Sequence, residues 1–93
     1  MRIYPRTKFA DINDFSTQAK HINSEVWEFI LESRVLGNDP KKMILEAHDI
    51  IQSAYTLMDI LEREYPGQAW AAREETIEKN RVRGYYPEGG CEK

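Results

Sequence analysis

Gly37-Asn38-Asp39-Pro40 is the stretch that decides the fold of this chain. Gly37 follows Val35-Leu36 and suits the end of a helix, because glycine readily adopts the left-handed conformation of a C-terminal cap. Asp39 is a suitable N-cap, and Pro40 fits the first turn of a helix, where its missing N–H breaks no hydrogen bond. The stretch therefore predicts that one helix ends here and the next begins. Two long helices joined by so short a link pack antiparallel, as a helical hairpin.

Apolar residues recur at helical spacing on both sides of this link. Before it they are Phe15, Ala19, Ile22, Val26, Phe29 and Ile30, and after it they are Met43, Ala47, Ile50, Ile51, Ala54, Met58 and Leu61. The first helix can start at Asp11 or at Asp14, since both are plausible N-caps. The second should run to about Glu64, because Tyr65-Pro66-Gly67 breaks it. A shorter third helix fits Gln68 to about Arg81.

The ends of the chain lack this pattern. Residues 1–10 are basic, contain Pro5 and predict an irregular N-terminal arm, and residues 84–93 form a turn-rich tail. Nothing alternates with period two for long enough to make a sheet. We expect one all-α domain over residues 1–93, since a chain of this length has room for no more.

Composition excludes several classes of protein. Cys91 is the only cysteine, which excludes a disulfide framework and a cysteine-based zinc site. We find no secretory signal, and the apolar runs are too short to span a membrane. The net charge is −3, and acidic and basic residues are spread along the chain. A protein that binds a nucleic-acid polymer usually has a clustered basic face, so we expect no such partner. The lone cysteine fits a reducing, cytoplasmic setting. We expect a homodimer or homotetramer, because so small a core is marginal alone.

Two acidic pairs stand out on the long predicted helices: Glu25-x-x-Glu28 and Glu46-x-x-Asp49. On a helical wheel of about 100° per residue, each pair lies at the margin of the apolar face, at nearly the same offset. In an antiparallel hairpin two such margins can converge. Carboxylates brought together repel each other, and a hard divalent cation such as Mg²⁺, which prefers oxygen ligands, offsets that repulsion.

A solvated acidic helix face is the alternative explanation of each pair. Glu25, Glu28 and Glu32 have no Lys or Arg at neighbouring helical positions, which argues against it. Lys42 is placed to pair with Glu46, which argues for it. His21 lies one turn before Glu25 and is expected to pair with that carboxylate. His48 is expected to be structural.

The ordered set of motifs resembles the all-α NTP pyrophosphohydrolases, and the MazG-like proteins among them. The resemblance rests on Ser24-Glu25-Val26-Trp27-Glu28, on Glu46-Ala47-His48-Asp49, and on Lys79-Asn80-Arg81-Val82-Arg83-Gly84, which is similar to a Lys-Asn-x-x-Arg-Gly stretch that often closes MazG-like domains. It covers residues 22–86. One position departs from the pattern, because Ser24 stands where many members carry a further glutamate.

The resemblance implies a function and a site. It implies a Mg²⁺-dependent hydrolase that cleaves a nucleoside triphosphate or dNTP into a monophosphate and pyrophosphate, for control of the nucleotide pool. Glu25, Glu28, Glu46 and Asp49 would be the catalytic metal ligands. Lys79, Asn80 and Arg83 would bind phosphate, although basic residues at a helix C-terminus also suit its dipole. It further implies that two long hairpins assemble into a four-helix bundle. The alternative is a helical oligomer with a degenerate metal site that acts as an interaction module.

Overall fold

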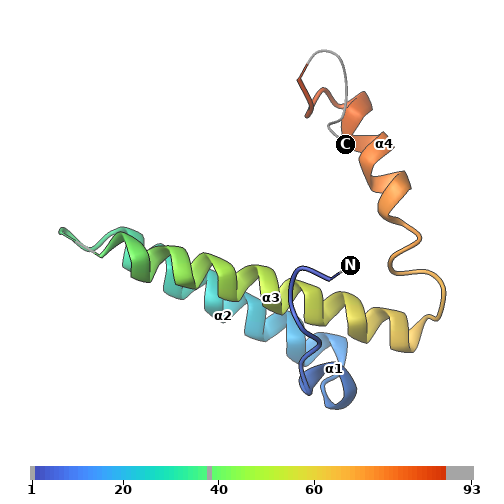
Figure 1. The fold of residues 1–93 in the computed structure, drawn as a ribbon, viewed down its shortest axis with the longest axis horizontal. Coiled ribbons are helices and arrows are strands. Elements are labelled where there is room, and N and C mark those ends of the chain that lie inside the picture. Colours follow the sequence, from blue (N-terminus) through green and yellow to red (C-terminus); the bar gives the residue numbers. More distant parts are fainter. Residues whose placement is uncertain (1, 38, 88–93) are drawn as a thin grey trace.

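The computed structural model describes residues 2–37 and 39–87, and in that part of the chain all regular structure is helical (Figure 1). The helices are α1 (Phe9–Ile12), α2 (Phe15–Ser33), α3 (Pro40–Glu64) and α4 (Arg73–Val82). The all-α prediction is confirmed. None of these helices is both long enough and apolar enough to cross a lipid bilayer.

Side-chain caps start the two long helices where the sequence places them. The Asp14 carboxylate accepts the backbone N–H of Thr17 at 2.7 Å, so α2 begins after Asp14 and not after Asp11, which lies inside α1. That hydrogen bond lowers the pKa of Asp14. Asp39 accepts the N–H of Lys41 at 3.0 Å, and α3 starts at Pro40 and ends at Glu64, as predicted.

Three boundaries differ from the sequence-based prediction. The irregular arm ends earlier, because Phe9–Ile12 form the short helix α1. Helix α2 ends at Ser33, since the N–H of Arg34 bonds the carbonyl three residues back in a tightened last turn, and Gly37 (φ +73°) lies in the link that follows. The third helix begins at Arg73, five residues later than predicted.

The late start of α4 has a local cause. The Glu62 carboxylate accepts the backbone N–H groups of Gly67 and, at 3.0 Å, Ala69. These bonds hold the chain in turns after α3, and Gly67 adopts φ +82° there. The apolar group Ala69-Trp70-Ala71-Ala72 therefore forms part of the connection instead of the first turn of a helix.

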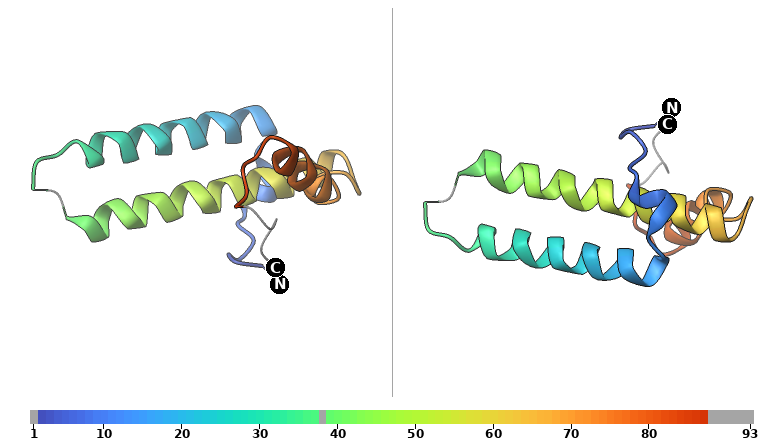
Figure 2. Two further views of the ribbon diagram at one scale, coloured as in Figure 1. Left: turned by 90° about the horizontal axis from the view of Figure 1, so that it is seen from above. Right: turned by 90° about the horizontal axis from the view of Figure 1, so that it is seen from below.

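Helices α2 and α3 lie side by side and run in opposite directions (Figure 2). Their interface is unusually polar. In the described part of the chain, the only fully buried apolar residues are Ala10 of α1 and Ile60 of α3, whereas the buried polar residues are Gln18, Ser53, Thr56 and Asp59. The Gln18 amide donates to the Ser53 carbonyl at 3.1 Å, which satisfies both groups inside the interface.

The N-terminal arm crosses α3 (Figure 1). The Arg2 guanidinium binds both carboxylate oxygens of buried Asp59, at 2.7 and 3.1 Å. The Tyr4 hydroxyl is hydrogen-bonded to His48 Nδ1, and the Tyr4 ring meets the Tyr55 ring edge-on. These contacts tie residues far apart in the sequence and give the arm a fixed place.

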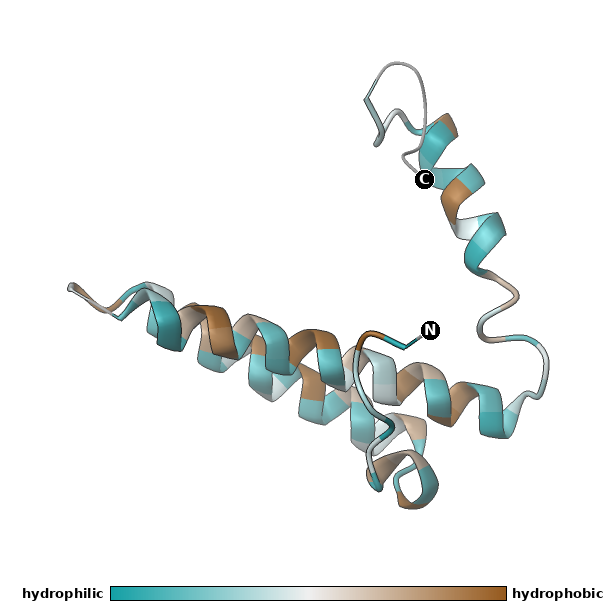
Figure 3. Cartoon of the chain, viewed as in Figure 1, coloured by the Kyte–Doolittle hydropathy of each residue, from teal (hydrophilic) through white to brown (hydrophobic). Residues whose placement is uncertain are grey.

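Helix α4 packs against none of the other helices and projects away from the α2–α3 pair (Figure 1). Figure 3 shows that most of its residues are hydrophilic. On α2 and α3, by contrast, Trp27, Leu31, Ile44, Leu45 and Ile51 each expose about half of their surface. A single chain thus leaves much apolar surface in water.

The thin core makes Ile60 the most sensitive apolar position. We expect Ile60→Ala to lower the free energy of unfolding by about 2–5 kcal/mol, because it removes a fully buried side chain and leaves a cavity. Chemical denaturation followed by circular dichroism measures the change. Ile12→Ala, at a position that is 69% exposed, is the matched control and should change little. Equal effects of the two substitutions would contradict this account of the core.

Candidate functional site

Two cross-helix contacts bracket the acidic pairs. Gln18 of α2 meets Ser53 of α3 on one side, and Glu32 of α2 meets Lys42 of α3, with Nζ and Oε1 3.4 Å apart, on the other. Glu25 and Glu28 lie between the α2 members of these contacts. Glu46 and Asp49 lie between the α3 members. The four carboxylates predicted to bind metal therefore occupy facing stretches of two adjacent helices.

Glu25 is largely buried in the interface between α2 and α3. Its side chain is 16% exposed, and one carboxylate oxygen accepts a hydrogen bond from the Ser53 hydroxyl. The other oxygen lies 3.2 Å from His21 Nε2, which confirms the predicted pairing. Glu25 therefore has one described partner on its own helix, His21, and one on α3, Ser53.

The helical spacing suggested that Lys42 pairs with Glu46, but the structure shows no such pair. The Lys42 ammonium group reaches across to Glu32 instead. Because this contact takes the cation to the edge of the acidic stretch, it leaves the Glu46 carboxylate without the partner that the sequence offered. Glu32 is thereby part of an ion pair, which favours a structural role for it.

Most acidic side chains in the described part of the chain accept a hydrogen bond or form an ion pair. Asp59 binds Arg2, Asp14 and Asp39 cap helices, and Glu62 holds a turn. Four make no such contact with any described residue: Glu28, Glu46, Asp49 and Glu75. Three of these four are predicted metal ligands, whereas Glu75 lies on exposed α4.

Glu46 differs from the other three because it is partly buried. Its Oε1 atom is buried and has no hydrogen-bond partner among the residues described. Leaving a buried carboxylate oxygen unpaired costs free energy. A cation or a bound ligand at this position would remove that cost. Glu28 and Asp49 are exposed, so their side chains have room to turn toward such a ligand.

The carboxylates are not gathered at one point in the single chain. Residues 2–37 and 39–87 contain no group of three or more His, Cys, Asp or Glu side chains close enough to hold a metal ion. Glu25 and Asp49 do line one cavity of about 170 Å³ together. The donors present are all oxygens, which suits Mg²⁺, an ion that fills its shell with water and phosphate oxygens besides a few carboxylates.

The predicted phosphate contacts lie elsewhere. Lys79 and Asn80 are on α4, Arg83 follows it, and α4 contacts neither α2 nor α3. The acidic pairs therefore receive none of these groups from their own chain. Arg81, which lies between Asn80 and Arg83 in the sequence, is bound to Glu78 instead, with its Nη2 atom 2.5 Å from Oε2. This hydrogen bond lowers the pKa of the Glu78 carboxyl.

The sequence pattern did not single out Gln18, whose side chain is almost fully buried beside the acidic stretch. The signal was present, because Gln18 shares the helical face of Phe15 and Ile22, where an apolar residue would be ordinary. A polar residue on a buried face requires a partner, here the Ser53 carbonyl and Asn13. His48, as expected, makes a structural contact, with Tyr4.

In comparisons with known proteins, no family model, no curated protein and no solved structure matches the chain.

The unpaired oxygen of Glu46 predicts that this carboxylate destabilises the metal-free protein. In EDTA, Glu46→Met should raise the free energy of unfolding by about 1–3 kcal/mol, because the thioether chain fills the same space and buries no unpaired oxygen. Thermal unfolding measures the change. Glu75→Met, at an exposed acid that also lacks a partner, is the control and should have little effect. A loss of stability in Glu46→Met would show that Glu46 is a structural residue.

Proposed function

We propose that this protein is a Mg²⁺-dependent nucleoside triphosphate pyrophosphohydrolase whose metal ligands are Glu25, Glu28, Glu46 and Asp49. One observation carries the proposal. The acidic side chains without a partner are concentrated in the facing stretches of α2 and α3, although almost every other described acid has one. The motifs that resemble the MazG-like proteins fall on these same residues.

Electrostatics supports a cation at this place. Glu28, Glu46 and Asp49 form no ion pair with any described residue, and Glu25 pairs only with His21. Such a set of carboxylates is unfavourable without positive charge, so it is expected where binding of a divalent ion compensates the repulsion. Bound Mg²⁺ would draw the carboxylates together, neutralise triphosphate charge and polarise the phosphorus that is attacked.

The reaction that suits these groups is hydrolysis at the α-phosphorus. Water adds to that phosphorus, the bond from it to the oxygen bridging to the β-phosphate breaks, and pyrophosphate leaves with that oxygen. The water proton passes to solvent or to a carboxylate. An anionic leaving group requires no side-chain acid to protonate it. The role of the protein is to hold charge and position the reactants.

A second copy of the chain completes the proposed site. Helix α4 projects away from its own acidic stretch, so Lys79, Asn80 and Arg83 serve best if they reach the acids of a partner. The half-exposed apolar residues of α2 and α3 supply a surface for such a partner, and the opposite charges of the two regions favour the contact. We therefore propose that two helical hairpins form a four-helix bundle, in a homodimer or homotetramer.

Substitution of single carboxylates tests the metal site. Glu28→Gln and Asp49→Asn should each abolish Mg²⁺-dependent release of pyrophosphate from a panel of NTPs and dNTPs, because each removes one charged metal ligand. Circular dichroism should show unchanged helicity, since both residues are exposed. Glu75→Gln removes a comparable exposed charge outside the site and should keep full activity. Full activity of both site variants would rule out these ligands. No pyrophosphate release by the unaltered protein would favour the alternative, an interaction module.

Mixing of variants tests the supply of cations by a partner. A Glu28→Gln chain and a Lys79→Ala/Arg83→Ala chain, each inactive alone, are co-expressed with different tags. If the partner supplies α4, a mixed dimer contains one intact site, and the population should recover about a quarter of the unaltered activity. If α4 folds back over its own chain, no intact site forms and no activity returns. A monomer in sedimentation would also contradict this arrangement.

A further inference from the structure

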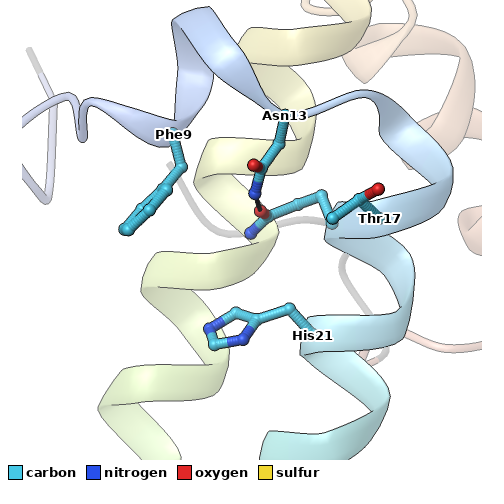
Figure 4. Close-up of a pocket in the computed structure, with 5 residues that line it drawn as sticks. Phe9, Asn13, Thr17 and His21 are labelled. Carbon is cyan, nitrogen blue, oxygen red and sulfur yellow. Dashed lines mark hydrogen bonds between the residues drawn. The ribbon is translucent and has the colours of Figure 1, made fainter.

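A recess lined by aromatic and amide groups adjoins the acidic stretch on the side of α1. One cavity of about 130 Å³ is lined by Phe9, Asn13, Thr17, Gln18 and His21. The cavity that contains Glu25 and Asp49 shares Phe9, Gln18 and His21 with it, so the two adjoin, and we call them together the recess. Figure 4 shows Phe9, Asn13, Thr17 and His21 arranged around it, between α1 and the first turns of α2.

We infer that this recess holds the base of the nucleotide, with the Phe9 ring as its stacking surface and the amides of Asn13 and Gln18 as the groups that distinguish bases. The inference rests on the proposed function and concerns the base, the part of the substrate that the acidic pairs do not bind. The carboxylates and their cation can recognise only phosphate, whereas the recess offers the chemistry that a planar heteroaromatic ring requires.

Phe9 is suited to stacking because it is not used in the core. Its side chain lies at the edge of the recess, and the residue is 44% exposed although it is apolar. Lys8 Nζ lies 5.5 Å from the centroid of the same ring, which adds positive charge beside it. Stacking of a base on an aromatic side chain is favourable and tolerant of sequence, since every base has a π-face.

The amides keep hydrogen-bonding capacity for a ligand. Asn13 Nδ2 donates to Gln18 Oε1 at 3.0 Å, and Gln18 Nε2 donates to the Ser53 carbonyl at 3.1 Å. These bonds use one N–H of each amide and leave a second N–H on each, together with the Asn13 Oδ1 acceptor. A base edge that carries a donor next to an acceptor matches this set. Because Gln18 is buried, hydrogen bonds made there compete little with water.

The wall of the recess is held in place before any ligand binds. The Arg63 guanidinium donates to the carbonyls of Ala10 at 2.9 Å and Asn13 at 2.8 Å, so one side chain of α3 fixes both α1 and the turn before α2. Ala10 is fully buried beneath this contact. A fixed wall reduces the entropy lost on binding, as a specificity site requires.

Equilibrium binding separates the base from the phosphates. Titration calorimetry, with Ca²⁺ in place of Mg²⁺ to limit turnover, compares each dNTP with inorganic tripolyphosphate, which has no base. Phe9→Ala should weaken binding of the preferred nucleotide by about 5-fold to 100-fold and leave tripolyphosphate unchanged. Phe15→Ala is the matched control: Phe15 is also 44% exposed but lies outside the recess, so this substitution should change neither ligand.

Asn13→Ala should change the order of preference among bases without weakening tripolyphosphate, whereas Asn23→Ala, at an exposed position of α2, should leave the order intact. Phe9→Leu keeps apolar bulk without an aromatic face and provides a folded variant if Phe9→Ala loses helicity. Equal losses for nucleotide and tripolyphosphate, or no loss in any recess variant, would overturn the inference.

These outcomes are distinct from a failure of the proposed function. If the unaltered protein releases no pyrophosphate but binds a nucleotide more tightly than tripolyphosphate in a Phe9-dependent way, the hydrolase proposal fails and the base recess stands. If it hydrolyses nucleotides and the recess variants retain every base preference, the base recess fails and the hydrolase proposal stands.

Discussion

The hydrogen bond from the buried Gln18 amide to the Ser53 carbonyl is the contact on which the rest of the structure depends. It joins α2 to α3 at a defined level in an interface with few fully buried apolar side chains. A buried amide without a partner is destabilising by its full desolvation cost. A shift of one helix along the other would break this hydrogen bond, so the bond fixes the register more strictly than apolar packing alone would. The same amide accepts from Asn13 and so ties the start of α2 to this level. The placement of the acidic pairs opposite each other follows from that register.

A polar interface has a consequence for stability. Hydrophobic burial is the main favourable term in folding, and in the single chain it is concentrated around Ile60 and Ala10. Contacts such as Arg2 with Asp59 and Arg63 with two backbone carbonyls add specificity, but ion pairs and hydrogen bonds contribute modestly in net terms. Burial of the apolar side chains that are half-exposed on α2 and α3, as in the proposed oligomer, would add further stability.

Local signals in the sequence were sufficient for the long helices. Asp39 and Pro40 act within one turn, so the start of α3 is correct, and the break after Glu64 is equally local. The start of α4 was wrong because Glu62, several residues away, holds the intervening turns through its side chain. Near the candidate site, the pairing of His21 with Glu25 could be predicted from spacing, since both residues lie on α2. Lys42 was assigned to a neighbour on its own helix, whereas its partner Glu32 is on the other. Contacts between helices, and the direction of α4, depend on tertiary geometry that no periodicity encodes.

The order of groups along α2 and α3 gives the proposed substrate one direction. The aromatic and amide groups come first, beside α1; Glu25 and Asp49 follow at the boundary of the recess; Glu28 and Glu46 lie farther toward the Gly37 link. A nucleotide has the same polarity, from a flat base that stacks and hydrogen-bonds to a triphosphate that requires positive charge. With its base at Phe9, its phosphates extend toward the acids that lack partners, where a cation would be needed to accept them. The reverse orientation would place the triphosphate beside the Phe9 ring, near the single charge of Lys8, and would leave a cation at the carboxylates without phosphate oxygens to bind. The unpaired carboxylates and the recess thus support a single orientation, although each was identified from different residues.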